Sequence, residues 1–367
     1  MSVSTIAAGG QPQTARRHRP GAVAAWLFLC CALIFAMVVV GGVTRLTLSG
    51  LSITEWRPVT GIVPPLSAAD WAAEFDRYRQ VPEYAAVHAG MSLAEFKTIY
   101  FWEYGHRLLG RLIGVAFALP LLWFWARGIL PRRLRWPLAG ILLLGGAQGA
   151  LGWYMVESGL SARLEVSQYR LVAHLALALA LYAAILWVAL GICQSPSPPF
   201  RGEGEKSDAP AAWRRAAEAV LCLVGLTILA GGFVAGLRAG LTYNTFPLMD
   251  GRFVPAGYAQ LQPFARNWFE NIAAVQFDHR LLAITTAAAI ALVWAVGMRA
   301  GLQWPARRAL HLLLGAAGLQ FGLGVATLLF VVPLPLAAAH QAGALLLLTA
   351  AIVFRHSLRQ VGEDDGG

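Results

Sequence analysis

Charged side chains are scarce in this sequence. Lysine, arginine, aspartate and glutamate make up 13% of its 367 residues, whereas hydrophobic residues make up 57%. A soluble protein of this size carries roughly a quarter charged residues, so the shortage excludes an ordinary soluble globular protein. Apolar runs of about 20 residues recur along the chain, and each is long enough to cross ~30 Å of hydrocarbon. The composition therefore predicts an all-α polytopic membrane protein.

Cysteine is rare as well, with four residues in the chain. Cys30, Cys31, Cys193 and Cys222 fall inside apolar runs or at their cytoplasmic ends, so no disulfide is expected in the outer loops. Small apolar packing residues are the better interpretation of all four. The spans also lack an acid at their centre, and only Pro120 lies deep within one, which disfavours a secondary transporter.

Basic residues are plentiful, and their distribution indicates how the chain crosses the membrane. Eight spans are predicted, at about 23–44, 106–128, 136–156, 171–192, 215–236, 280–300, 308–331 and 336–355. The segments on one side of the spans hold sixteen basic and seven acidic residues, whereas those on the other side hold thirteen and twelve. The positive-inside rule then places both termini in the cytoplasm. The net charge of +10 is thus a topology signal, and no nucleic-acid partner is expected.

A linker divides the chain into two similar parts. Residues 194–213 have linker composition, and four motifs recur in the same order on either side of them. The pairs are Gly41-Gly42 with Gly231-Gly232, His106-Arg107 with His279-Arg280, Gln148 to Gly152 with Gln320 to Gly324, and, more loosely, the stretches ending at His174 and His340.

Each part has an even number of spans, so the repeats run parallel and are related by a pseudo-two-fold axis along the membrane normal. We expect four-helix bundles at 23–193 and 214–355, with cytoplasmic tails at 1–22 and 356–367. The first span is expected to be retained, because it is too long for the apolar region of a signal peptide and has no matching cleavage site.

The outer loops of the two parts are unequal. In loop 45–105, Ser67 can cap a helix through Trp71 and Phe75, and Ser92 with Glu95 forms a capping box. The corresponding loop, 237–278, is richer in glycine, proline and aromatic residues. Loops of this size with their own structure are usually functional.

Four of the eight histidines occupy equivalent places in the two repeats. His106, His174, His279 and His340 each stand near the outer end of an even-numbered span, whereas His18, His88, His311 and His356 are assigned to solvated surfaces or interfaces. Ionisable groups at membrane depth usually face the bundle interior, and two imidazoles that meet across a bundle suit the axial positions of a haem iron. The neighbouring Arg107 and Arg280 either pair with haem propionates or extend to the membrane surface.

Two alternatives to this interpretation are weaker. A zinc or copper site could use Glu103, His106 and His174, but the second half has Gln276 where the first has Glu103. A cytochrome that carries electrons across the membrane needs haems near both faces, whereas all four histidines lie on the outer side. Haem sites on one side of the membrane are therefore the prediction.

The difference between Glu103 and Gln276 predicts different roles for the two halves. Glu103 lies about one helical turn before His106, on the same face of the helix. A carboxylate there can accept a proton or stabilise developing positive charge, whereas an amide is a poor substitute. The half with Glu103 is the candidate for chemistry, and the half with Gln276 for a resident cofactor.

Several longer motifs resemble the haem A synthase family. They are residues 95–107 (EFKTIYFWEYGHR), 148–160 (QGALGWYMVESGL), 235–240 (AGLRAG), 243–249 (YNTFPLM), 275–280 (VQFDHR) and 340–341 (HQ). The resemblance runs from about Gly41 to the eighth span and omits the tails and the linker. One departure is that some members carry paired cysteines in the outer loops, which this chain lacks.

The resemblance implies an oxidoreductase that converts the C8 methyl group of haem O to a formyl group, which gives haem A for cytochrome oxidase. The substrate ligands would be His106 and His174, the essential acid Glu103, and the ligands of haem b His279 and His340. Expected partners are haem O from haem O synthase, an unidentified electron donor, cytochrome oxidase assembly factors and the bilayer of a bacterial inner membrane. A haem carrier that leaves haem unaltered, and a quinol-linked cytochrome b, remain alternatives.

Overall fold

The computed structural model describes residues 20–57, 60–161, 165–193 and 211–359, and this part of the chain is helical without a β-strand. Eight of its helices are long and apolar enough to cross a membrane, which confirms the predicted number of spans. They are α1 (Pro20–Leu46), α4 (Leu93–Ala126), α5 (Arg132–Ser161), α6 (Gln168–Cys193), α7 (Ala211–Gly236), α9 (Ile272–Arg299), α10 (Trp304–Leu329) and α11 (Leu334–Ser357).

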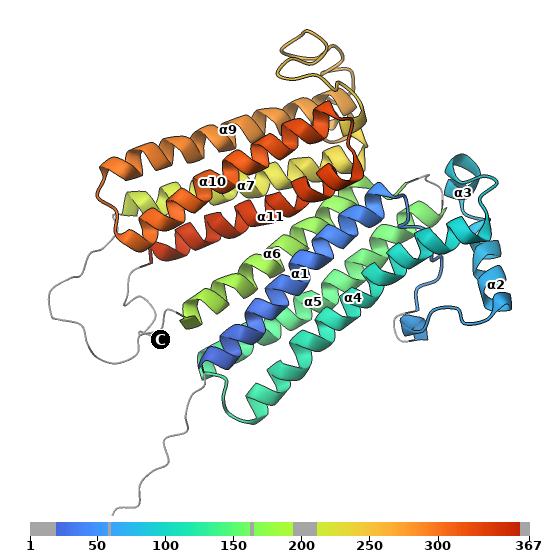
Figure 1. Cartoon of the computed structure of the whole chain (residues 1–367), viewed down its shortest axis with the longest axis horizontal. Helices are drawn as coiled ribbons and strands as arrows, with labels where there is room; N and C mark the ends of the chain where they lie inside the picture. Colours follow the sequence, from blue (N-terminus) through green and yellow to red (C-terminus); the bar gives the residue numbers. More distant parts are fainter. Residues whose placement is uncertain (1–19, 58–59, 162–164, 194–210, 360–367) are drawn as a thin grey trace, which may run out of the picture.

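The long helices form two groups of four (Figure 1). Helices α1, α4, α5 and α6 pack together, as do α7, α9, α10 and α11. The two groups meet where α1 and α6 of the first contact α11 and α7 of the second. The largest buried cluster runs through this junction and contains Leu27, Ala189, Val224 and Leu345 among its fully buried members. Two packed bundles therefore share one hydrophobic core.

Short helices cover one end of each bundle. In the first half they are η1 (Thr60–Ile62), α2 (Ala68–Tyr78) and α3 (Pro82–Val87), and in the second half η2 (Ala239–Leu241), η3 (Phe264–Arg266) and α8 (Asn267–Glu270). Ser67 caps helix α2, as the sequence predicts, and Asp70 completes a capping box with it. An aromatic cluster of α2 and α4, which includes Trp71, Phe75 and Phe96, holds α2 against the end of α4.

Helix α4 begins earlier than the predicted span. The Ser92–Glu95 capping box starts it at Leu93, so 13 residues of the expected loop belong to the helix. With 34 residues and ~1.5 Å of rise per residue, α4 is longer than a bilayer core requires. Its first turns therefore extend beyond the membrane, where α2 and α3 pack against them.

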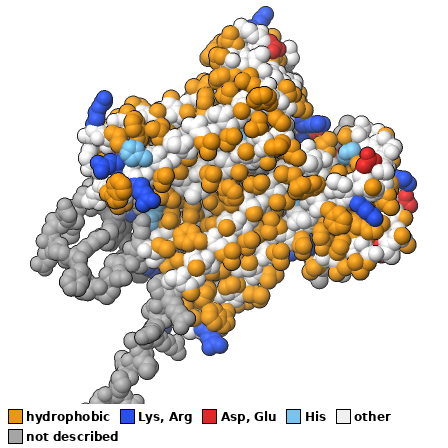
Figure 2. Space-filling model, viewed as in Figure 1, with side chains coloured by type: hydrophobic (Ala, Val, Ile, Leu, Met, Phe, Trp, Pro, Cys, Tyr) orange, Lys and Arg blue, Asp and Glu red, His pale blue; other side chains and the backbone are white. Residues whose placement is uncertain are grey.

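Hydrophobic side chains cover the middle of the bundles, and charged side chains gather towards both ends (Figure 2). The exposed apolar residues lie on the outward faces of the spans and include Leu119, Leu143, Leu292 and Leu312. A membrane helix needs such a surface, because lipid takes the place of a protein partner. The surface supports the assignment of the chain as a multi-pass membrane protein.

The ends of some elements differ from the sequence prediction. Helix α7 begins at Ala211, so the last residues of the predicted linker are helical, and the rest of the linker lies outside the described residues. The assignment of His356 to a solvated tail is wrong. Helix α11 continues to Ser357, and the His356 ring is buried edge-on against Trp187, with centroids 4.9 Å apart. His18 lies outside the described residues.

Candidate functional site

Each of the four repeated histidines contacts a glycine on a neighbouring helix. His106 on α4 lies against Gly41 of α1, His174 on α6 against Gly152 of α5, His279 on α9 against Gly231 of α7, and His340 on α11 against Gly324 of α10. A Cβ atom added to any of these glycines would lie 2.9–3.0 Å from the Cε1 atom of its histidine. The absence of a side chain on the glycine is therefore what leaves room for the imidazole.

The glycine contacts place the histidines towards the bundle interior in equivalent ways. In each half, the first histidine rests on the first helix of the bundle and the second rests on the third helix. The two imidazoles of a half lie within electrostatic range of one another. The sequence prediction that these four side chains are related by the repeat thus has a packing explanation.

The hydrogen bonds of the imidazoles differ between the halves. In the second half, Nδ1 of His279 lies 3.1 Å from the carbonyl oxygen of Thr227, and Nδ1 of His340 lies 3.1 Å from the amide group of Gln320. A hydrogen bond from Nδ1 to a carbonyl oxygen leaves Nε2 free to bind a metal. The Thr227 contact provides this arrangement for His279, whereas the amide nitrogen of Gln320 faces Nδ1 of His340 and donates to it.

In the first half the Nδ1 atoms of both histidines are buried without a hydrogen-bond partner among the described residues. The amide nitrogen of Gln148, the repeat partner of Gln320, donates to the backbone carbonyl of His174 at 3.0 Å and lies 3.4 Å from Nε2 of the His174 ring. An unpaired buried polar atom is costly, and such atoms cluster where a ligand or water completes the site. The imidazoles of the first half are therefore less constrained by the protein than those of the second.

These residues fit two axial ligands of a haem in each half. An imidazole pair across a bundle supplies the two nitrogens that a six-coordinate haem iron needs. The described residues contain no group of three or more His, Cys, Asp or Glu side chains that could hold a metal ion. The zinc or copper alternative built on Glu103, His106 and His174 thus lacks its third ligand.

Glu103 is buried at the outer end of the first bundle, with 3% of its surface exposed. Its Oε2 atom accepts hydrogen bonds of 2.8 Å from the Ser52 hydroxyl and the Ile53 backbone N–H. Its Oε1 atom accepts hydrogen bonds of 3.0 and 2.6 Å from Nε and Nη2 of Arg107. Four donors therefore hold the carboxylate in one orientation beside the loop that follows α1.

Arg107 and Arg280 bind the outer loops in equivalent ways. Arg107 donates to the backbone carbonyls of Ile53 and Glu55, at 2.8 and 3.1 Å. Arg280 donates to the carbonyls of Tyr243 and Thr245, at 2.5 and 2.8 Å. The alignment of the two halves pairs residue 53 with 243 and residue 55 with 245. Each arginine thus holds the loop that follows the first helix of its bundle. A haem propionate that paired with Arg107 or Arg280 would have to share the guanidinium with these carbonyl oxygens.

Gln276 makes different hydrogen bonds from Glu103, although it occupies the equivalent place. Its amide nitrogen donates to the carbonyls of Ala239 and Thr242, at 2.7 and 2.6 Å, and its amide oxygen accepts from Arg280 at 2.9 Å. A carboxylate could not donate to those carbonyls, and an amide could not accept from four donors as Glu103 does. The loop of the first half therefore offers hydrogen-bond donors to the Glu103 carboxylate, whereas the loop of the second half offers carbonyl acceptors to the Gln276 amide nitrogen.

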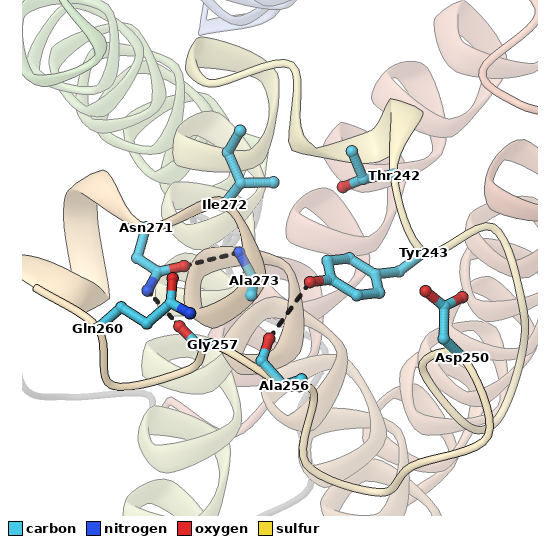
Figure 3. Close-up of a pocket in the computed structure, with 9 residues that line it drawn as sticks. All are labelled: Thr242, Tyr243, Asp250, Ala256, Gly257, Gln260, Asn271, Ile272 and Ala273. Atoms are coloured by element: carbon cyan, nitrogen blue, oxygen red, sulfur yellow. Dashed lines mark hydrogen bonds between the residues drawn. The ribbon is translucent and has the colours of Figure 1, made fainter.

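A cavity lies over the outer end of each bundle. The cavity of the first half, of about 480 Å³, is lined by Ile53, Tyr104 and Arg107 among others. The cavity of the second half, of about 400 Å³, lies among the loop residues shown in Figure 3, where Asn271 and Tyr243 hold the loop by hydrogen bonds to Gly257 and Ala256. The first cavity borders the partners of Glu103, whereas loop side chains and the start of α9 enclose the second.

Sequence reasoning singled out the histidines, Glu103 and the two arginines as candidates but did not name the residues that contact them. Ser52, Thr227 and the glycines beneath the histidines belong to the site. The repeat comparison contained a signal for the glycines, because Gly41, Gly152, Gly231 and Gly324 all lie in its matched motifs. Thr227 had no such signal, since its backbone carbonyl makes the contact.

Comparison with known proteins identifies the family of this chain. A family model described as cytochrome oxidase assembly protein, COX15-CtaA, matches residues 24–352. A protein of Nitrosospira multiformis named heme A synthase is 55% identical over 92% of this chain and 94% of its own length. Proteins of the same name from Rhodospirillum centenum and Nitrosomonas eutropha are 51% and 49% identical, over 98% and 92% of this chain and 93% of each relative. This chain therefore belongs to the COX15-CtaA family of cytochrome oxidase assembly proteins.

Proposed function

We propose that this protein is a haem A synthase of the bacterial inner membrane. It oxidises the C8 methyl group of haem O to a formyl group and so produces haem A for cytochrome oxidase. Relatives about 50% identical over most of the chain carry that name. The observation that carries the proposal is a pair of equivalent histidine sites, of which only one has a buried carboxylate beside it.

The two halves take different haems. Haem O is the substrate of the bundle at 23–193, between His106 and His174, and haem b is resident in the bundle at 214–355, between His279 and His340. The unpaired Nδ1 atoms of the first half suit a group that must enter and leave. The contact of His279 Nδ1 with the Thr227 carbonyl suits permanent ligation, because a partner of this kind fixes the orientation and tautomer of a metal ligand. Haem b supplies one-electron redox chemistry when bound, and the electron donor is unidentified.

Glu103 is the catalytic acid of this proposal. Its four donors fix the carboxylate in one orientation one helical turn from His106, so it needs no reorganisation to stabilise positive charge at the reacting substituent, and to accept a proton it would release one of the four donors. Arg107 holds both the carboxylate and the loop that shields it. The Arg107 and Arg280 side chains also remain candidate partners of the propionates.

The Glu103→Gln variant tests the assignment. We expect it to retain haem at both sites but to make little haem A, with a fall of roughly 10²-fold or more in conversion, the order of a lost acid–base group. The measurement is chromatography of haems extracted from purified protein after co-expression with a haem O supply. The matched control is Asp76→Asn, which makes the same carboxylate-to-amide change at an exposed position of α2 in the same half and leaves Glu103 in place, and we expect normal haem A production from it.

The same chromatograms decide between an enzyme and a carrier. Haem A, or its hydroxylated precursor, beside haem b in the unaltered protein supports the oxidase. Unaltered haem O alone, in a host that supplies a working reductant, supports a haem carrier. A normal yield of haem A from Glu103→Gln contradicts the role of that residue without contradicting the reaction.

A further inference from the structure

A glutamine of the second half lies across one turn of the first helix of the other half. Gln341 follows His340 on α11, and its amide nitrogen donates to the carbonyl oxygen of Val38 on α1 at 2.8 Å. A Cβ atom added to Gly42, one turn further along α1, would lie 1.5 Å from the amide oxygen of Gln341. The amide group of Gln341 therefore packs directly against the backbone of α1 between Val38 and Gly42, where Gly42 has no side chain to cover it.

The residue before Gly42 contacts the first histidine of the other half. Gly41 is the glycine beneath His106, and a Cβ atom added to it would lie 2.9 Å from His106 Cε1. A short physical connection thus links the two sites: His340 and Gln341 are neighbours on α11, Gln341 contacts α1 at Gly42, and Gly41 contacts His106. Helix α1 is the shared element, because it packs against both α4 and α11.

The halves also meet where α6 packs against α7, and an equivalent residue contacts an equivalent glycine there, without a hydrogen bond. Leu175 follows His174 on α6 and approaches Gly232 of α7, with 3.2 Å between its Cδ2 atom and an added Cβ atom. The preceding Gly231 is the glycine beneath His279. The residue after the second histidine of each half thus contacts the glycine pair that carries the first histidine of the other half. At the α11–α1 junction this residue is Gln341, which donates a hydrogen bond, whereas at the α6–α7 junction it is the apolar Leu175.

We propose that Gln341 is a positioning residue that couples the two histidine sites. By holding the backbone of α1 at Val38 and Gly42, it sets the position of Gly41 and therefore of the His106 imidazole in the other half. Close-packed interiors transmit such displacements, and the space between the Gly41 backbone and the ring is too small even for a methyl group, since an added Cβ atom would lie 2.9 Å from His106 Cε1. The proposal rests on the proposed function, in which each histidine pair holds a haem.

The test is the Gln341→Met variant of the full-length protein, which keeps the length of the side chain and removes its donor. The readouts are the haem content per chain and the low-spin ferric signals in electron paramagnetic resonance after co-expression with a haem O supply. His106→Ala and His279→Ala assign each signal to its half. We expect Gln341→Met to shift the signal of the His106 site and to lower its occupancy on the order of tenfold. The signal of the adjacent His340 site stays unchanged.

Leu175→Met is the matched control, because it places the same residue at the equivalent junction with little change in volume, and we expect both signals to persist. An unchanged His106 signal in Gln341→Met overturns the proposal, as does a change confined to the His340 site. If Gln341→Met does not accumulate, Gly42→Ala tests the same contact by displacing the amide from α1, with the same expected and overturning results. If His106→Ala and His279→Ala leave both signals unchanged, the assignment of haems to these histidines is wrong. If the histidine variants assign the signals but Gln341→Met changes neither of them, only the coupling is rejected.

Discussion

At the scale of single residues, the positions beneath the four histidines require glycine as strictly as the ligand positions require histidine. A histidine ring can approach a neighbouring helix this closely only where that helix has no side chain. Adding a methyl group to a well-packed interior costs typically 1–3 kcal/mol, because rings and backbones must move to admit it. The glycine motifs of the two repeats therefore have a function in placing the imidazoles, beyond allowing helices to pack.

The Gly41→Ala variant should lose the site of the first half alone. Its Cβ atom would push the His106 ring away, and the packing cost corresponds to roughly a tenfold or greater loss of haem affinity at that site. Haem content and the spectrum of the bound haem measure the effect. Gly231→Ala should produce the same loss in the second half, whereas Gly21→Ala, on the same helix as Gly41 with no atom near the added methyl, should change neither. Equal effects at both sites from Gly41→Ala would contradict this explanation.

At the scale of elements, local signals predicted more than long-range ones. The Ser67 cap and the Ser92–Glu95 capping box, which starts α4, were readable from the sequence because each depends on residues within one helical turn, and the structure has both. The burial of His356 depends instead on a contact with Trp187, which lies far away in the sequence. No local pattern contains that information.

Helix α3 carries a buried acid that the sequence did not single out. Glu83 is 4% exposed, and no ion pair forms between its carboxylate and the other described residues. Burial, together with the negative charge of Glu103, raises the pKa of Glu83 to about 8, although Arg45 and Arg238 act in the opposite direction. The group is therefore protonated in the folded loop at pH values where it would be ionised in an unfolded one.

The stability of the outer loop of the first half should therefore fall as pH rises. Because the folded pKa of Glu83 is raised above its ordinary value of 4.5, its contribution is fully present below that value and is lost as pH rises towards about 8. His88 acts in the opposite direction at the acid end of this range, since burial lowers its pKa below 6.5 and its contribution increases with pH until the unfolded imidazole is also neutral. Hydrogen exchange of residues 68–87 should be faster at pH 8.5 than at pH 6 after correction for the intrinsic rate.

Glu83→Gln should remove this pH dependence, because an amide does not ionise. Asp76→Asn, which changes an acid with 65% of its side chain exposed on neighbouring α2, should retain it. A pH dependence that persists in Glu83→Gln would assign the effect to another group of the loop.

At the scale of the whole molecule, the two halves are equivalent in backbone contacts and different in chemistry. The arginine hydrogen bonds to residues 53 and 55 recur at residues 243 and 245, and the glycine contacts recur at all four histidines. Around the histidines, the differences include Glu103 against Gln276, the partners of Nδ1, and Gln341 against Leu175. The sequence repeat predicted the shared architecture and the first of these differences. The Nδ1 partners depend on how neighbouring helices of one bundle pack, and the Gln341 contact depends on which helices face each other across the junction.

The orientation of the molecule in the membrane can be tested with its own cysteines. The charge pattern predicts that Cys193, exposed at the end of α6, faces the cytoplasm, whereas α2 lies outside. In a Cys222→Ala background, a membrane-impermeant maleimide should label Cys193 only after the cells are permeabilised, and should label an added Asp76→Cys in intact cells. Cys30 and Cys31 are buried, so they contribute little background. Since the outer loops lie at the same end as Glu103, labelling of Asp76→Cys in intact cells would also place the candidate site at the outer face, and the reverse pattern would place it in the cytoplasm.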